Sequence, residues 1–242
     1  MTKPILLFGP TASGKTDLSI ELAKQINAEI ISADSMQVYR FMDIGTAKPS
    51  PEQRKTIPHH LIDVVNPDQE WTVSEFIKRT KMLIKEISIK GKKTIIVGGT
   101  GLYLNSFING YSFPIVPKNE LIRRKLSKID IKELYNKLQI IDSKSAEKIH
   151  SNDKKRIIRA LEVYEQTGIP ISKLQKKKQN KNLILICLNI DRELLYERIN
   201  ERVDKMIQDG FVEEVKYLIR RGYNRNLASM QAIGYKQIIE HL

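Results

Sequence analysis

The sequence predicts an α/β protein with a mainly parallel sheet flanked by helices and interrupted by an all-helical insertion. Two observations carry this prediction. Short apolar segments alternate along the chain with segments of helical periodicity, as they do in parallel sheets. Between residues 118 and 182 this alternation stops, and only helical periodicity continues, for example at Ile157, Leu161 and Tyr164.

Four apolar segments are the expected strands, at residues 5–8, 28–32, 94–97 and 183–188. The last segment contains Cys187, the one cysteine of the chain, which we expect to be buried in its strand. A single cysteine allows neither a disulfide framework nor a zinc cluster, in keeping with a reducing cytoplasm.

The segments between and after these strands predict the helices. The first spans about 18–26, the second begins at the capping sequence Thr72-Val73-Ser74-Glu75, and the third follows Gly101. Helical patterning returns over residues 192–221, and a last helix is expected from about Met230. Residues 43–66 contain many turn formers and are expected to form a long functional loop.

We expect a core domain of residues 1–117 and 183–242 and a helical insertion domain of residues 118–182. The insertion contains 18 Lys and Arg against 8 Asp and Glu, a net charge of +10, whereas the whole chain carries +13. Such a concentration of positive charge favours binding to a polyanion such as nucleic acid. A lysine-rich protein with solvated helix faces is the alternative interpretation.

The apolar runs are all short. None approaches the roughly 20 residues that a membrane helix needs, and the N-terminal run is too short for a signal peptide. The sequence therefore predicts a soluble, cytoplasmic protein, which we expect to be a monomer.

A phosphate-binding motif follows the first expected strand. It matches G-x-x-x-x-G-K-[ST] in full and consists of Gly9, Pro10, Thr11, Ala12, Ser13, Gly14, Lys15 and Thr16. Glycines let backbone N–H groups surround phosphate oxygens, and the N-terminus of the following helix adds positive potential. Lys15 offers a charge to the terminal phosphate, and Thr16 offers a hydroxyl to Mg²⁺. The predicted fold is therefore P-loop NTPase-like.

The motif does not specify the phosphate chemistry. In an ATPase or kinase an apolar strand usually ends in an aspartate that supports the metal, whereas residues 94–97 are followed by Gly98 and Gly99. Asp34 follows the second expected strand and should lie at the sheet edge where ligands bind. A turn or helix-capping role is the alternative for Asp34.

Two pairs of residues are further candidates for the phosphate site. Arg198 and Arg202 are four residues apart and so share one helix face, although a solvated basic face would look the same. His59 and His60 fit a polar loop pair, or part of the wall of the phosphate site, better than a metal centre, because a lone pair of histidines is a weak metal signature.

Five motifs together resemble the tRNA dimethylallyltransferase (isopentenyltransferase) family. They are the phosphate loop, Asp34-Ser35-Met36-Gln37-Val38-Tyr39, Asp43-Ile44-Gly45-Thr46-Ala47-Lys48-Pro49, His59-His60-Leu61-Ile62-Asp63 and Gly98-Gly99-Thr100-Gly101-Leu102-Tyr103. The resemblance continues through residues 152–163 to Arg198, Arg202 and Gly234-Tyr235, and so covers essentially the whole chain. Family members usually continue further beyond the last motif, with a basic helical segment.

The resemblance implies transfer of a dimethylallyl group from dimethylallyl diphosphate to the exocyclic amine of the adenosine on the 3′ side of the tRNA anticodon, with Mg²⁺ as cofactor. It implies that Asp34 is the general base and that Thr100 and Arg202 contact the leaving pyrophosphate, with Lys15 and Thr16 at the phosphate and the metal. The implied partner is the tRNA anticodon stem-loop. Its implied contacts are Asp34, Ser35, Met36, Gln37, Thr100, Arg123, Lys155, Arg156, Ile157, Ile158, Arg159, Gln231, Ala232, Ile233, Gly234, Tyr235 and Lys236.

Three other functions stay open from the sequence. An isopentenyltransferase acting on free adenine nucleotides and a P-loop small-molecule kinase would both use the phosphate loop, but neither needs the charge of the insertion. A non-catalytic RNA-binding module would use that charge but leaves the phosphate loop unexplained.

Overall fold

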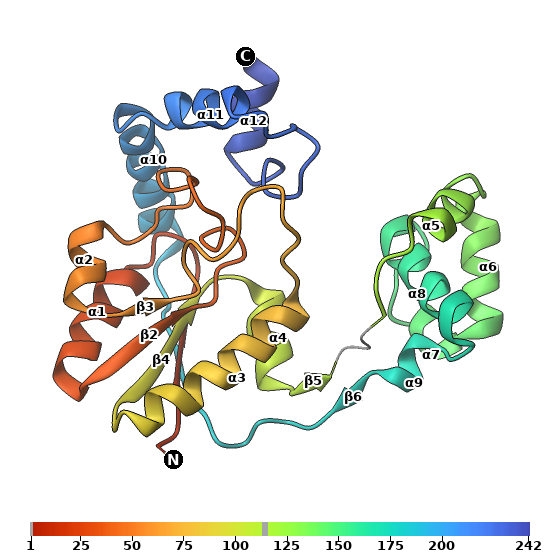
Figure 1. Ribbon diagram of the computed structural model, residues 1–242, viewed down its shortest axis with the longest axis horizontal. Helices are drawn as coiled ribbons and strands as arrows, with labels where there is room; N and C mark the ends of the chain where they lie inside the picture. The colour runs from red at the N-terminus through yellow and green to blue at the C-terminus, as the bar shows by residue number, and fades with distance from the viewer. Residues whose placement is uncertain (1, 113–115) are drawn as a thin grey trace. The chain divides into compact units, whose positions relative to one another are not determined.

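The structure is a computed structural model that describes residues 2–112 and 116–242 (Figure 1). The chain forms two compact units. One consists of Met1–Ile108 with Asn180–Leu242, and the other of Asn109–Gln179. We call them the sheet unit and the helical unit. The sequence places the insertion at residues 118–182, so the observed unit begins nine residues earlier and ends three residues earlier.

The sheet unit is built on a five-stranded parallel sheet of order β3-β2-β4-β1-β7. The strands are β1 (Ile5–Phe8), β2 (Ala28–Ser32), β3 (His59–His60), β4 (Lys93–Gly98) and β7 (Ile184–Cys187). The four predicted strands are confirmed within one or two residues. The two-residue strand β3 was not predicted, because two histidines after a proline carry no apolar alternation.

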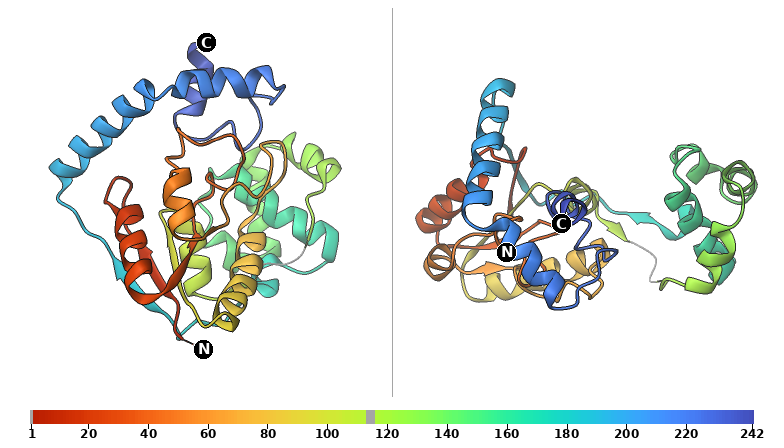
Figure 2. Two further views of the ribbon diagram at one scale, coloured as in Figure 1. Left: turned by 60° about the vertical axis from the view of Figure 1, so that its left-hand side comes forward. Right: turned by 90° about the horizontal axis from the view of Figure 1, so that it is seen from above.

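Helices cover both faces of this sheet, as Figures 1 and 2 show. On one face lies α1 (Lys15–Ile26), and on the other lie α3 (Val73–Ile89) and α4 (Gly101–Ile108). Thr72 caps α3 by accepting a hydrogen bond from the Glu75 backbone N–H, as its sequence predicts. The strand side chains are buried on both faces, which explains why the segments read as continuous apolar runs rather than as alternating ones.

The predicted loop between Asp43 and Asn66 is more ordered than expected. It contains the short helix α2 (Pro51–Thr56) as well as β3. Ser50 and Gln53 form a reciprocal capping box at the start of α2. The expectation of a loop over the whole segment was therefore wrong at α2 and β3.

After β7 the chain forms α10 (Arg192–Gln208), α11 (Phe211–Arg220) and α12 (Tyr235–His241). The break between α10 and α11 falls at Gly210, whose φ of 98° only glycine adopts without strain. The last helix begins at Tyr235 and not near Met230 as predicted, because Gly234 has a φ of 88° and the residues before it form turns.

The prediction that Cys187 is buried was wrong, since its side chain is exposed. β7 is the edge strand of the sheet and pairs only with β1. Its neighbours Ile184 and Leu185 are also exposed, Leu185 by 51%. An apolar run predicts a strand but does not predict whether both faces of that strand are covered.

The helical unit contains α5 (Glu120–Ser127), α6 (Ile131–Ile141), α7 (Ser143–Ala146), α8 (Lys154–Thr167) and α9 (Ile171–Leu174). These helices share one apolar core, in which Leu126, Leu134, Leu138, Ile157 and Leu161 are buried. The unit therefore has its own hydrophobic core, as its helical periodicity predicts.

Two short strands lie near the ends of the helical unit. β5 (Tyr111–Ser112) pairs antiparallel with β6 (Lys176–Lys177). The sequence predicts only helices between residues 118 and 182, so the strand β6 was not predicted. Within residues 2–112 and 116–242, no helix combines the length and the apolar character that crossing a membrane requires.

Candidate active site

A cavity of about 370 Å³ lies in the sheet unit where β1, β2 and β4 end. Its walls come from residues 11–16 of the phosphate loop, from Asp34 and Gln37 after β2, and from Arg198 and Arg202 on α10. Ligands bind at this edge of open α/β sheets. The structure therefore brings the predicted phosphate loop, carboxylate and arginines to one cavity.

The phosphate loop has the backbone that anion binding needs. Ala12 and Gly14 both have positive φ values, 61° and 82°, and Gly14 is the N-cap of α1. At Gly9 an added Cβ would lie 2.7 Å from the Leu188 carbonyl oxygen, so a side chain there would collide with the neighbouring strand. Lys15 Nζ donates to the Gly9 carbonyl at 3.0 Å and also to the Pro10 carbonyl.

Three ionisable groups in the cavity interact electrostatically. Burial lowers the pKa of Lys15, and the positive charge of Arg202 lowers it further, while Asp34 partly offsets both effects. Burial likewise lowers the pKa of Arg202, again offset by Asp34. Three cations, Lys15, Arg198 and Arg202, line the cavity together with the N-terminus of α1. The carboxylates of Asp17 and Asp34 offset them only in part, so the site suits a ligand with several negative charges.

Asp34 has one oxygen fixed and one available. Oδ1 accepts hydrogen bonds from the backbone N–H groups of Met36 at 2.8 Å and Gln37 at 3.3 Å. This is the turn role that the sequence left open, and it coexists with a place in the cavity wall. No group in the described part of the chain donates to Oδ2, so this oxygen is the one that can accept a proton from a substrate.

Thr100 lies next to Asp34 in the fold but does not line the cavity. Its Oγ1 accepts a hydrogen bond from the Ser35 backbone N–H at 3.0 Å. β4 and β2 can approach this closely because Gly98 has no side chain; an added Cβ would lie 2.3 Å from the Ala33 carbonyl oxygen. Gly98, the last residue of β4, therefore allows close packing beside the site, which is a reason for a glycine where an aspartate would occur in other phosphate-loop enzymes.

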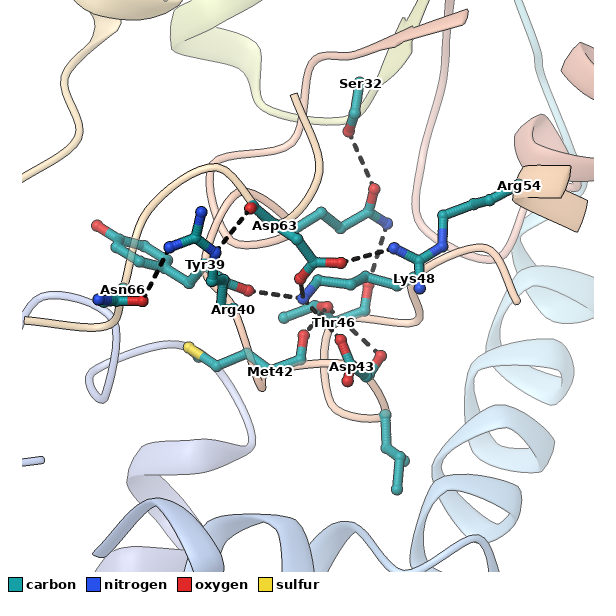
Figure 3. Close-up of polar contacts among 12 residues, drawn as sticks. Ser32, Tyr39, Arg40, Met42, Asp43, Thr46, Lys48, Arg54, Asp63 and Asn66 are labelled. Carbon is teal, nitrogen blue, oxygen red and sulfur yellow. Dashed lines mark hydrogen bonds and ion pairs between the residues drawn. The ribbon is translucent and has the colours of Figure 1, made fainter. Parts of the chain in front are cut away.

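Gln37 joins the end of β2 to the long loop that follows. Its Oε1 accepts from Ser32 Oγ at 3.0 Å, and its Nε2 donates to the carbonyl oxygens of Thr46 and Ala47, both at 3.2 Å (Figure 3). Gln37, Thr46 and Ala47 all line the cavity. The side-chain amide thus fixes one wall of the site.

Lys48 stabilises the same loop from its buried side, a role that its sequence context does not predict. Its side chain is 1% exposed, and Nζ donates to the Tyr39 carbonyl at 2.6 Å, to Asp43 Oδ1 at 2.7 Å and to Asp63 Oδ1 at 2.6 Å (Figure 3). Arg54 binds the other oxygen of Asp63 at 2.6 Å. The fold brings Asp43 and Asp63 to the same ammonium group, so the sequence alone does not identify this buried cluster.

His59 lines the cavity, in agreement with the predicted polar wall. His60 instead binds the buried carboxylate of Glu29 at 2.7 Å. Among the residues that the structure describes, no group of three or more His, Cys, Asp and Glu side chains could hold a metal ion.

The cavity fits a Mg²⁺ ion only together with a phosphate ligand. Thr16 lines the cavity and offers a hydroxyl. Mg²⁺ usually takes one or two protein ligands and completes its octahedron with water and substrate phosphates. The donor set around Thr16 matches that pattern and not that of a preformed metal site.

The predicted RNA-contacting residues of the helical unit fall into two groups. Lys155 and Arg156 are exposed in the first turn of α8. Arg123 and Arg159 instead bind Glu162, whose side chain is fully buried, at 2.8 and 2.7 Å. Despite its burial, these guanidinium groups and the Asn119 backbone N–H lower the pKa of Glu162 to about 2.

Three other predicted RNA contacts have buried side chains. Ile157 lies in the core of the helical unit, and Ala232 and Tyr235 lie in an apolar cluster of the sheet unit. These three side chains pack beneath the protein surface and are not part of it. Beside them, Ile233 is 90% exposed.

The chain is similar to known proteins over nearly its whole length. A family model described as IPP transferase matches residues 37–242. A tRNA dimethylallyltransferase from Thermoanaerobacter sp. (strain X514) is 51% identical over 248 aligned residues, which cover 98% of this chain and 79% of that protein.

Solved structures give the same result. The tRNA isopentenylpyrophosphate transferase of Bacillus halodurans is 42% identical with a TM-score of 0.71, over 100% of this chain and 77% of that one. A eukaryotic dimethylallyltransferase described as acting on tRNA is 30% identical with a TM-score of 0.83, over 99% of this chain and 63% of that one.

Proposed function

We infer that this chain, which belongs to the tRNA dimethylallyltransferase (IPP transferase) family, transfers a dimethylallyl group from dimethylallyl diphosphate to an adenosine of tRNA. The acceptor is the exocyclic amine of the adenosine on the 3′ side of the anticodon, and pyrophosphate is released. One observation supports this best: the cavity combines a phosphate loop with a carboxylate that has a free oxygen.

Asp34 is the general base of this proposal. The adenine amine is a weak nucleophile because its lone pair is conjugated with the ring. As the new nitrogen–carbon bond forms and the carbon–oxygen bond to the diphosphate breaks, the amine must lose a proton. Oδ2 of Asp34 accepts it, which contributes roughly 10²–10⁴ in rate for a positioned base.

The phosphate loop, Lys15 and Arg202 bind the diphosphate and stabilise the charge that develops as it leaves. Thr16 would hold a Mg²⁺ ion together with the diphosphate, and the ion would neutralise part of that charge. Thr100 acts indirectly in this proposal, because its hydroxyl holds Ser35 next to Asp34.

The helical unit provides contacts for the tRNA anticodon stem-loop. Lys155 and Arg156 are exposed cations that RNA phosphates can reach, and the ion pair of Arg156 with Asp153 at 3.3 Å lies at the surface. Loop adenosines leave their stack at low cost, so the target base can enter a cavity.

One assay tests the function against its rivals. Wild-type protein is incubated with labelled dimethylallyl diphosphate and Mg²⁺, with either tRNA or AMP as acceptor. We expect label in tRNA and not in AMP. Label in AMP alone would favour an isopentenyltransferase of free nucleotides, and label in neither would contradict prenyl transfer. In a separate incubation with ATP, phosphoryl transfer to a small molecule would favour a kinase.

A further inference from the structure

The carboxylate of Glu214, on α11, binds three consecutive backbone N–H groups of the loop after β2. Oε2 accepts from Asp43 and Ile44, both at 2.8 Å, and Oε1 accepts from Gly45 at 3.2 Å. The loop and α11 are about 170 residues apart in the sequence. A run of N–H groups that converge on one point is an anion-binding arrangement, and here the anion is a side chain.

A fourth donor completes the arrangement. The Tyr235 hydroxyl donates to Glu214 Oε1 at 2.5 Å, and the Tyr235 ring is fully buried. Burial and the Glu214 charge raise the pKa of Tyr235, so the phenol keeps its proton and remains a donor. Four donors on two oxygens require a carboxylate, because an amide has one acceptor oxygen and an NH₂ that cannot accept.

The loop also packs directly on α11 at this point. A Cβ added to Gly45 would lie 2.1 Å from Cε2 of Phe211, so the loop backbone lies against that ring. The Phe211 and Tyr235 rings meet edge to face at 4.8 Å. The position of residues 43–45 is therefore set by α11 and the start of α12.

Residues 43–45, which Glu214 binds, are followed directly by two residues of the cavity wall. Thr46 and Ala47 follow Gly45, and their carbonyl oxygens receive the two hydrogen bonds of the Gln37 amide (Figure 3). The backbone N–H of Gln37 in turn donates to Asp34 Oδ1. A continuous series of hydrogen bonds and backbone links thus leads from Glu214 to the carboxylate assigned as the base.

We propose that Glu214 is a positioning residue for the transfer reaction, which holds residues 43–47 so that Gln37 and Asp34 keep their places in the cavity. This proposal rests on the proposed function for its activity readout. Because Glu214 acts on the wall that carries Asp34 and not on the phosphate loop, its loss should lower kcat and leave diphosphate binding unchanged.

The test compares Glu214→Gln with Glu213→Gln. Glu213 is adjacent on the same helix, exposed, and paired with Lys216 in the next turn. We expect Glu214→Gln to lower kcat about tenfold while KM for dimethylallyl diphosphate stays within about twofold, and Glu213→Gln to match wild type. Equal kcat values for both variants, or a Glu214→Gln defect confined to KM for the diphosphate, would overturn the proposal.

Hydrogen exchange provides a readout that does not depend on activity. The amides of Asp43, Ile44 and Gly45 should exchange faster in Glu214→Gln than in Glu213→Gln, with α1 unchanged. If the wild-type chain transfers no label, the proposed function fails, while this exchange result still decides whether Glu214 holds the loop. Unchanged exchange at the three amides counts against Glu214.

Tyr235→Phe serves as a second variant if Glu214→Gln does not fold. It removes one of the four donors and keeps the ring, so a smaller fall in kcat in the same direction is expected. A wild-type kcat together with wild-type exchange in Tyr235→Phe would show that the carboxylate needs no such support, and would count against the proposal.

Discussion

The two units each contain a buried charged side chain with two partners of opposite charge, and the two clusters are built in opposite senses. In the sheet unit the cation Lys48 lies between the carboxylates of Asp43 and Asp63, and Arg54 balances the second carboxylate. In the helical unit the anion Glu162 lies between two guanidinium groups. Both clusters replace apolar contacts where irregular backbone or helix ends must be held together.

The difference lies in the charge that remains. Lys48 and Arg54 against two carboxylates leave no net charge beside a cavity that we expect to hold a diphosphate. Arg123 and Arg159 share one carboxylate, so within these three side chains the cations outnumber the anion on the unit that we expect to bind RNA. A neutral cluster can fix a wall without repelling an anionic ligand, whereas the second cluster gives stability and still adds to a basic surface.

The largest expected effect distinguishes loss of the proposed catalytic base, Asp34, from loss of the ion-pair clusters. Asp34→Asn keeps an Oδ1 that can accept from Met36 and Gln37 but removes the basic oxygen. Transfer to tRNA should fall by about 10²–10⁴, while the thermal midpoint and the tRNA affinity stay near wild type. Single-turnover kinetics with labelled dimethylallyl diphosphate measure this. Near-normal turnover would remove the assigned role from Asp34.

Breaking the cluster of the helical unit should give the largest loss of stability. Glu162→Ala leaves two half-buried guanidinium groups without their shared partner and should lower the free energy of unfolding by about 3 kcal/mol. Glu165→Ala, on an exposed position of the same helix, is the matched control. Urea denaturation followed by circular dichroism measures both, and equal midpoints would contradict the role of Glu162.

The same cluster predicts a pH dependence with a definite sign. The folded-state pKa of Glu162 is about 2, below the unfolded value of about 4.3. Its contribution is therefore fully present above about pH 4.3 and is lost as the pH falls towards 2. The wild-type chain should lose more stability over this range than Glu162→Ala does.

The elements that sequence could predict are those made by neighbours in the chain. The phosphate loop with its flanking strand and helix, the strands β1, β2 and β4, and the Thr72 cap all follow from local patterns. Glu214 could not be predicted, because its partners lie about 170 residues away and a Glu in a first helical turn has an ordinary local explanation.

The sequence predicts where positive charge is concentrated better than it predicts which of the charged side chains are accessible. The pattern identifies the helical unit as basic, but it does not distinguish Arg156, which is exposed and pairs with Asp153 at the surface, from Arg159, which binds the buried Glu162. Cys187 shows the same limit for apolar residues, because burial at an edge strand depends on what packs over it.

Breaking the cluster of the sheet unit should have a smaller effect on stability. Lys48→Met removes three hydrogen bonds that a buried ammonium donates, but Asp43 and Asp63 are partly exposed and can regain water. We expect a loss of about 2 kcal/mol and a severalfold fall in transfer. The control is Lys55→Met, an exposed lysine on α2. A variant as stable as the control would show that the loop does not depend on Lys48.

The smallest expected effect tests which cations of the helical unit are accessible to RNA phosphates. Removing Lys155 and Arg156 together should weaken tRNA binding severalfold and flatten the slope of log K against log salt by about 1.4–1.8, since each phosphate contact contributes roughly 0.7–0.9. Arg123→Ala should change stability more than it changes the slope, because its charge is paired with Glu162. Binding measured by filter retention across a salt series distinguishes the two variants. If Arg123→Ala flattened the slope as much per residue as the double variant, the ion pair would not withhold Arg123 from RNA. The contrast between cations that bind the buried Glu162 and cations exposed at the surface would then be wrong.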